Sequence, residues 1–285
     1  VIGDYKETMV VYGLLDQGQP VQYIKINKAF LGEGDALLYA QIKDSVQFVN
    51  ALTVEIKRIK NGTQMGATIL LTPTNMPKDA GLFYSADQAN AIYSFPTPAS
   101  TAANALKSDS EYELTITNGE TGNVVKGKTS LISDITGFVN PNPMGTTFSF
   151  VAFGTVPNYP FNVVWNSANN ARLYQVILRL NYVDSTSSGL DTSSISYTLP
   201  EIRMEDINFS VEVTQATKGR DFYKYIGNTL ADYSGLVQRE AINVDLLLVA
   251  GSNDLSTFID VNKPSTGIIQ ERPEYTNITN GLGLF

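Results

Sequence analysis

Three stretches of the first half alternate apolar and polar residues on both sides of a short turn-forming segment, and this pattern constrains the fold most. In the second stretch the turn is Asn61-Gly62, a dipeptide typical of two-residue β-hairpin loops. Alternation with a period of two, bounded by Gly, Asn, Asp or Pro, predicts antiparallel hairpins. The three hairpins are expected at 8–30, 51–73 and 111–132.

Two local features of these hairpins lead to further expectations. The alternation slips between Tyr23 and Ile24, which predicts a β-bulge in the second strand. The densest basic patch of the chain is Lys57-Arg58-Lys60, and a short run of this kind predicts the solvated face of a strand.

The second half is also predicted to be β-rich. A segment rich in Gly, Pro and Asn at 132–148 favours a domain boundary, so we expect an N-terminal domain at 1–135 and a C-terminal domain at 136–285. We expect mainly β structure: two β-sandwich domains of immunoglobulin or fibronectin type III kind, the second with one or two short helices. The strands of the second domain are expected at 147–153, 162–168, 172–184, 194–202 and, as a buried strand, 240–252. Its helical segments are expected near the end of 205–233 and at 253–262, the latter capped by Asn253.

Composition removes whole classes of function. The 285 residues include neither His nor Cys, which excludes Ser-His-Asp triads, thiolate nucleophiles, disulfides and zinc sites of the ordinary type. The formal net charge of -8 argues against nucleic acid as a partner. We assign no catalytic, cofactor-binding or metal-binding residues, and the ligand-binding residues remain unknown.

Gly32-Glu33-Gly34 follows a predicted strand, as in loops that bind phosphate. A dinucleotide-binding loop requires a third glycine, and Leu37 occupies that position. Two acids in the loop would also repel a phosphate. We therefore predict a bend, after which Asp35 caps a short helix at 36–42.

Acidic residues form two groups in the sequence. Paired carboxylates can hydrolyse glycosides without His, and acidic loops can bind calcium, so both functions stay open beside the simpler interpretation of solvated acids. We interpret 183–194 as a long solvated hairpin loop. The first group is Glu33, Asp35 and Asp44, and the second is Asp184, Asp191 and Glu201.

Aromatic residues are concentrated at 222–233, which suggests either a platform for sugar rings or a helix with one buried face. We favour a helix whose Phe222, Tyr225 and Ile226 face the core. Trp165 alternates with Val163 and is predicted to be buried. The remaining aromatic residues of this segment are Tyr223 and Tyr233, and Asn-x-Ser/Thr sequons occur at Asn61, Asn208 and Asn277.

The segment VVWNSANNARLYQVIL resembles the fibronectin-type pattern in Trp165, Ala171, Tyr174 and Val176. Together with VVYGLLDQGQPVQYIKINKAFLGEGDA, EYELTITNGETGNVVKGKT and PEYTNITNGLGLF, the chain resembles uncharacterised exported two-domain lipoproteins of Bacteroidetes. The resemblance implies a location in the cell envelope, anchoring to the outer membrane, and an N-terminal lipid on a Cys that this sequence lacks.

From these features we expect a non-enzymatic binding or structural protein of the cell surface. Its partner would be another envelope protein or a glycan, and no cofactor is expected. Two alternatives stay open: a glycan-binding accessory protein in polysaccharide uptake, and a carboxylate-dependent glycosidase.

Overall fold

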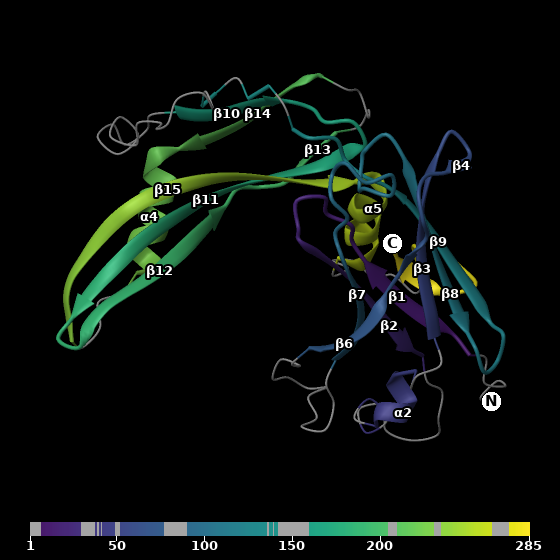
Figure 1. Cartoon of the computed structure of the whole chain (residues 1–285). Helices are drawn as coiled ribbons and strands as arrows, with labels where there is room; N and C mark the ends of the chain where they lie inside the picture. The colour runs from purple at the N-terminus through teal and green to yellow at the C-terminus, as the bar shows by residue number, and fades with distance from the viewer. Residues whose placement is uncertain are drawn as a thin grey trace, which may run out of the picture. The chain divides into compact units, whose positions relative to one another are not determined.

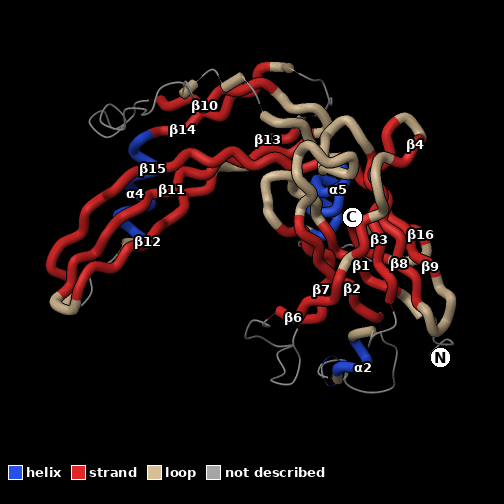
Figure 2. The backbone as a smooth tube through the Cα atoms, viewed as in Figure 1, coloured by secondary structure: helices blue, strands red, loops and turns tan. Residues whose placement is uncertain are grey.

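The structure is a computed structural model of the chain. It is mainly β, which confirms the predicted fold class (Figure 2). The chain divides into two compact units: unit 1 comprises Val1–Leu131 and Asp254–Phe285, and unit 2 comprises Ile132–Asn253. The structure describes residues 7–29, 38, 40, 42–48, 52–76, 90–135, 137–138, 140–141, 160–204, 210–230, 235–263 and 274–285.

Unit 1 contains two sheets whose inward residues share one apolar core, an arrangement compatible with the predicted sandwich. All strand pairs in it are antiparallel except β1 with β17, among the residues described. The first sheet has the order β17 (Leu282–Leu284), β1 (Met9–Gly13), β2 (Val21–Lys28), β7 (Asn90–Pro96), β6 (Thr72–Met76). The second has the order β16 (Ile278–Thr279), β9 (Val124–Ser130), β8 (Glu111–Asn118), β3 (Leu52–Lys60), β4 (Thr63–Gln64), with β5 (Ile69–Leu70) also paired to β3. The helices are α2 (Lys43–Val46) and α5 (Asn253–Asn262), and Figure 1 shows α5 beside β1.

The three predicted hairpins are confirmed. β1 pairs with β2, β3 with β4, and β8 with β9. At the β3–β4 turn Asn61 and Gly62 have φ angles of 49° and 76°. Positive φ at both central residues is the type I′ turn that an Asn-Gly dipeptide favours.

The predicted bulge in β2 is wrong. The strand keeps its register with β1 and β7, and its buried row is Gln22, Ile24 and Ile26. The apparent slip arises because a polar residue occupies an inward position. The Gln22 side chain donates to the Asp16 carbonyl at 2.6 Å and to Thr97 Oγ1 at 2.8 Å, which removes the cost of burying the amide.

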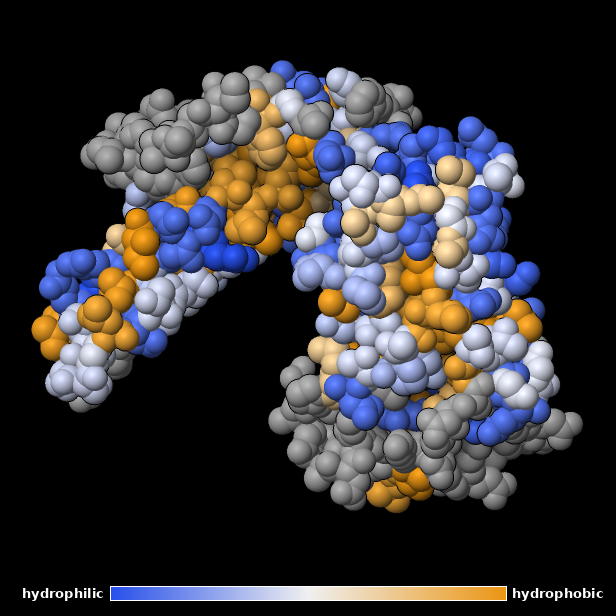
Figure 3. All heavy atoms as spheres, viewed as in Figure 1, coloured by the Kyte–Doolittle hydropathy of each residue, from blue (hydrophilic) through white to orange (hydrophobic). Residues whose placement is uncertain are grey.

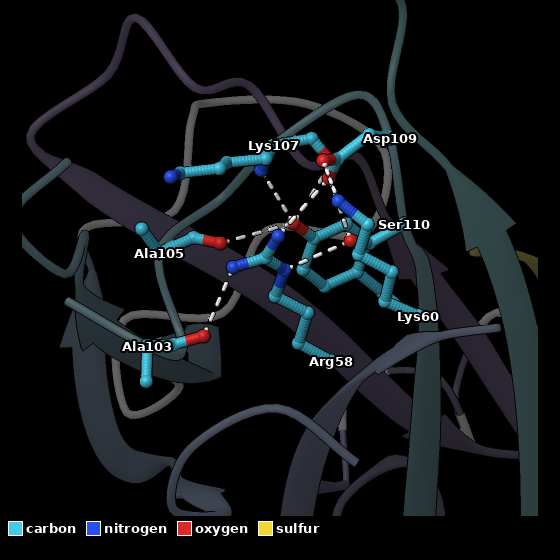
Figure 4. Close-up of polar contacts among 8 residues, drawn as sticks. Arg58, Lys60, Ala103, Ala105, Lys107, Asp109 and Ser110 are labelled. Atoms are coloured by element: carbon cyan, nitrogen blue, oxygen red, sulfur yellow. Dashed lines mark hydrogen bonds and ion pairs between the residues drawn. The ribbon is translucent and has the colours of Figure 1, made fainter. Parts of the chain in front are cut away.

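The prediction of a solvated face for the basic patch on β3 is wrong for Arg58. Arg58 is not on a solvated face: it is 4% exposed, in the same inward row as Ile56. Figure 4 shows its guanidinium surrounded by acceptors of the 99–110 loop. Nε donates to Ser110 Oγ at 2.9 Å, Nη1 to the Ala103 carbonyl at 2.9 Å and Nη2 to Asp109 Oδ1 at 3.0 Å. Every donor group of this buried cation therefore has a partner.

Unit 2 contains a two-stranded sheet and a sheet built around β11, and apolar side chains of both pack together. Trp165 is fully buried, as predicted, and its ring centroid lies 5.5 Å from the ring centroid of Tyr174. Figure 3 shows apolar residues (orange) along β11 and β15 on the visible face. The first sheet is β10 (Pro160–Asn166) with β14 (Glu212–Lys218). The second contains β11 (Ala171–Thr186), β12 (Gly189–Thr198), β13 (Ile202–Arg203) and β15 (Leu236–Ser252), and the helix is α4 (Gly219–Thr229).

Two expectations for these strands are wrong. Residues 183–194 do not form a long loop, because β11 continues to Thr186 and β12 begins at Gly189. The segment 240–252 is a strand, but it is mostly half-buried or exposed, since β15 pairs only with β11 among the described strands. The predicted strand at 147–153 lies outside the described residues.

The division of the chain also differs from the expected domains at 1–135 and 136–285. Residues 254–285 belong to unit 1, so unit 2 is inserted between β9 and α5. The helix at 253–262 forms as predicted, but as part of unit 1. The reason is that β16 and β17 complete the two sheets of unit 1, and Phe285 lies in their core. Among the described helices, none is long and apolar enough to span a membrane.

Candidate functional site

Unit 1 carries a groove of about 400 Å³ between the β1–β2 hairpin and α5. Its lining is dominated by apolar side chains from three parts of the chain. Those that form its walls are Tyr12, Leu14, Tyr23, Leu255, Phe258 and Leu284.

The alternation of β1 places the tyrosine and leucine of the groove on the outer face of the sheet. Met9 and Val11 point into the core, so Tyr12 points outward, and Leu14 follows two positions later. Tyr12 is 45% exposed, Leu14 57% and, from β2, Tyr23 44%. Three large apolar side chains are therefore open to solvent on one surface.

The helix α5 forms the opposite wall. The Phe258 ring packs edge-on against Tyr12, with ring centroids 6.0 Å apart and an interplanar angle of 72°. Edge-to-face packing of this kind stabilises aromatic pairs beyond the area that they bury. The pair joins α5 to the sheet, and Tyr12 still remains 45% exposed.

Polar contacts in the first turn of α5 hold the helix in place. The Asp254 carboxylate accepts hydrogen bonds from the Tyr275 hydroxyl at 2.6 Å and from Asn277 Nδ2 at 3.2 Å. Asn277 also binds the backbone of Phe285 through both its amide atoms. Burial, and then the Asp254 carboxylate, raise the pKa of Tyr275 above its usual value. The wall carrying Phe258 is thus tied to the last strands of unit 1.

Few polar groups of the groove are available to a ligand. The Gln22 amide is engaged: besides its bonds to Asp16 and Thr97, it donates to the Gln19 carbonyl at 3.2 Å and accepts from the Asp16 amide at 2.9 Å. Asp16 is exposed, and its Oδ1 accepts from the Gly18 amide at 2.8 Å. The charge of the lining is therefore one carboxylate at the rim.

The second acidic group of the sequence is engaged in ion pairs and strand pairing. Asp184 accepts two bonds from Arg239, at 2.6 and 2.8 Å, and stands opposite Asp191 in the β11–β12 register. Glu201 pairs with Arg203 at 3.0 Å. No group of three Asp, Glu, His or Cys that could hold a metal occurs among the described residues. The other acidic group lies outside the described side chains, as do Gly32 and Gly34.

The described part of the aromatic segment, up to Thr229, lies in α4, and the apolar face of the helix is largely as predicted. Phe222 is buried against Tyr197, Tyr225 and Ile226 are half-buried, and Tyr223 is exposed. Tyr233 lies outside the described residues. This segment therefore offers a single exposed tyrosine in the described part, in contrast to the groove of unit 1.

The three Asn-x-Ser/Thr sequons lie in different surroundings. Asn61 occupies the exposed β3–β4 turn, whereas the Asn277 side chain is engaged with Phe285 and Asp254. Asn208 lies outside the described residues.

The sequence reasoning missed the groove, although one signal was present. In VVYGLL both alternating rows are apolar, which is typical of a strand covered on both faces. The covering element is α5, far away in the sequence, and no local pattern identifies it.

Comparison with known proteins adds little. No protein family matches the chain, and no curated protein matches it in sequence. A crystal structure of the C-terminal globular domain of an oligosaccharyltransferase from Pyrococcus abyssi is similar at a TM-score of 0.28 and 8% identity. The match covers 86% of this chain and 47% of that chain, so this chain spans less than half the length of that structure. A similarity at this level assigns neither a fold nor a function.

Proposed function

We propose that this chain is a non-enzymatic binding module of the bacterial cell envelope, and that its ligand site is the groove of unit 1. The observation that carries the proposal is the exposure of Tyr12, Leu14 and Tyr23 around one concave surface. Soluble proteins seldom leave large apolar side chains grouped in a hollow unless a partner covers them. The groove offers packing area and one charge, which suits binding rather than acid–base chemistry.

The envelope location is a separate part of the proposal. It rests on the resemblance to exported two-domain lipoproteins of Bacteroidetes, which implies outer-membrane anchoring. Fractionation of the source cells tests it, with the protein expected in the outer-membrane fraction.

A glycan ligand is the second candidate function. Aromatic rings stack on the apolar faces of sugars, and Tyr12 and Tyr23 are both exposed in the groove. This observation favours a glycan-binding accessory protein over a purely structural one.

Methyl NMR of the whole chain tests the groove as a binding site. We expect 4-methylphenol, a neutral aromatic probe, to shift the methyl signals of Leu14, Leu255 and Leu284, because these line the groove. Leu70 is an equally exposed leucine on β5 and should not respond.

A matched pair of variants completes this test. Leu14→Ser should weaken the binding of 4-methylphenol, whereas Leu70→Ser should leave it unchanged. The proposal would be contradicted if 4-methylphenol shifted none of the groove methyl signals. It would also be contradicted if Leu70→Ser weakened binding as much as Leu14→Ser.

A further inference from the structure

We infer that the groove binds a peptide segment that presents an aromatic or aliphatic side chain next to a Lys or Arg. The inference rests on the proposed function, since it names the ligand class of the same site. Three properties of the groove carry it: its apolar walls, the engagement of its buried amide, and the sign of its one charge.

The walls determine the apolar part of the ligand. The exposed rings of Tyr12 and Tyr23 and the side chain of Leu14 would lose water on binding, as would Leu255 on α5. Burial of apolar surface is the main favourable contribution to such association. The volume of about 400 Å³ is at the low end of ligand pockets, and one or two side chains of a peptide would fill it.

The shortage of polar partners disfavours a neutral glycan. A sugar ring that enters the groove brings several hydroxyl groups, and each needs a hydrogen bond to offset the loss of water. Gln22 cannot provide one, because its amide nitrogen and oxygen are engaged within the hairpin. Among the described lining residues, the polar side-chain groups that remain are Asp16, Gln19 and the hydroxyls of Tyr12 and Tyr23, so few groups are available to replace the water around a sugar.

The charge at the rim selects a basic neighbour. Asp16 is the one charged residue among the described residues of the lining, and it is exposed. The chain as a whole carries a formal charge of -8, so its field attracts cations and repels acidic ligands such as free fatty acids. A Lys or Arg next to the buried side chain would reach the Asp16 carboxylate.

The test compares peptides that differ only in charge. N-acetyl-Phe-Lys-amide, N-acetyl-Phe-Gln-amide and N-acetyl-Phe-Glu-amide are titrated into the whole chain, and the Leu14, Leu255 and Leu284 methyl signals are followed. We expect affinity in the order Lys, Gln, Glu, with about a 2–5-fold step between neighbours, the range for an exposed ion pair.

The variant Asp16→Asn isolates the charge. Asn keeps an oxygen for the Gly18 amide, so the turn is retained while the carboxylate is lost. In this variant the affinity for the Lys peptide should fall to about the affinity for the Gln peptide. In the control Asp191→Asn, an exposed acid of unit 2 is neutralised and the order should persist.

The outcomes separate the two proposals. Equal affinity for the three peptides, or a preference that survives Asp16→Asn, overturns the peptide inference but leaves the groove as a site if 4-methylphenol binds. If maltoheptaose shifts the groove methyls and the peptides do not, the glycan function replaces the peptide inference. If 4-methylphenol also fails, the groove is not a ligand site and both proposals fall.

Discussion

Arg58 is a cation in the apolar layer between two sheets, and its partners fix the loop at 99–110 against β3. The guanidinium is suited to this position because its planar fork reaches three acceptors at once. Gln22 plays the corresponding part at the other sheet, where it joins the β1–β2 turn to Thr97. Each buried polar residue thus adds directed hydrogen bonds to a loop whose apolar anchors in the core are few, Leu106 in one case and Leu15 in the other.

Replacing Arg58 by Met should destabilise unit 1 by about 2–3 kcal/mol, because bonds to a charged donor are lost and their acceptors lose partners. Urea denaturation followed by far-UV circular dichroism measures the change. The control is Lys60→Met, which removes the other cation bound to Asp109 at 2.5 Å. Lys60 is far more exposed, so its loss should change the free energy of unfolding by less than about 1 kcal/mol. Equal effects would contradict the central role of Arg58.

The Asp109 carboxyl predicts a dependence of stability on pH. Hydrogen bonds from Lys60 and then Ser110, with further contributions from Arg58, hold its pKa well below the usual value for Asp. A lowered pKa in the folded state contributes stability above the unfolded value of about 3.9, and this stability is lost as the pH falls further.

The variant Asp109→Asn should therefore be less stable than the wild type at pH 7, and the two should converge as the pH falls below about 4. Urea midpoints at pH 7, 5 and 3 measure the difference. A gap that stays constant across this range would show that the carboxylate charge is not the cause.

At the scale of elements, β11, β12 and β15 form an extended ribbon whose far end has little core. Val237 and Ile242 are exposed on β15 and lie where the β11–β15 register shifts. Such irregularities interrupt the row of backbone groups that a free edge strand presents to other chains. The ion pair of Asp184 with Arg239 joins β11 to β15 in this region, and the guanidinium also lies 5.1 Å from the Tyr182 ring centroid.

Arg239→Met should destabilise the ribbon by about 3 kcal/mol, because it removes the cation that neutralises the buried Asp184 carboxylate, which stands opposite Asp191. Amide hydrogen exchange at 183–191 and 236–241 should speed up more than exchange in β10 and β14. The double variant Asp184→Leu with Arg239→Met should recover much of the loss, since no buried charge remains. Failure to recover would indicate that packing of the Arg239 side chain matters more than its charge.

At the scale of the whole molecule, unit 1 is assembled from two distant parts of the sequence. Residues up to 131 supply most of its strands, but β16 and β17 come after the insertion of unit 2. Gly283 makes the parallel pairing of β17 with β1 possible: its φ is +113°, and a Cβ there would lie 1.9 Å from the Val11 carbonyl oxygen. No other residue type fits this position without moving the strand.

Gly283→Ala should therefore unfold unit 1 at lower temperature while unit 2 is spared. The single Trp of the chain, Trp165, lies in the core of unit 2, so its fluorescence reports that unit, and circular dichroism reports both. Gly122→Ala is the control: Gly122 also has a positive φ, +72°, but a Cβ there meets no atom within 4 Å, so the cost should be only about 1–2 kcal/mol. Equal shifts for both variants would contradict the importance of the β1–β17 contact.

The sequence predicts the features that depend on neighbouring residues, such as turns and the start of a helix. It does not predict features whose partners lie far away in the chain. Asn61-Gly62 specifies its own turn, and Asn253 begins a helix at the expected place. Gln22 and Arg58 disrupted the apolar pattern because their partners lie 75 and 51 residues away, at Thr97 and Asp109. The groove could not be predicted for the same reason, since its walls come from both ends of the chain.

The insertion of unit 2 also affects how the protein is made. A ribosome releases the first 131 residues long before Leu282–Leu284, the strand that covers the outer edge of β1. Until then β1 has an open edge, and the space for Phe285 in the core is unfilled. Unit 2 is contiguous and can complete its fold first. The first half of the nascent chain therefore keeps an unpaired strand edge and an incomplete core until β16 and β17 have been synthesised.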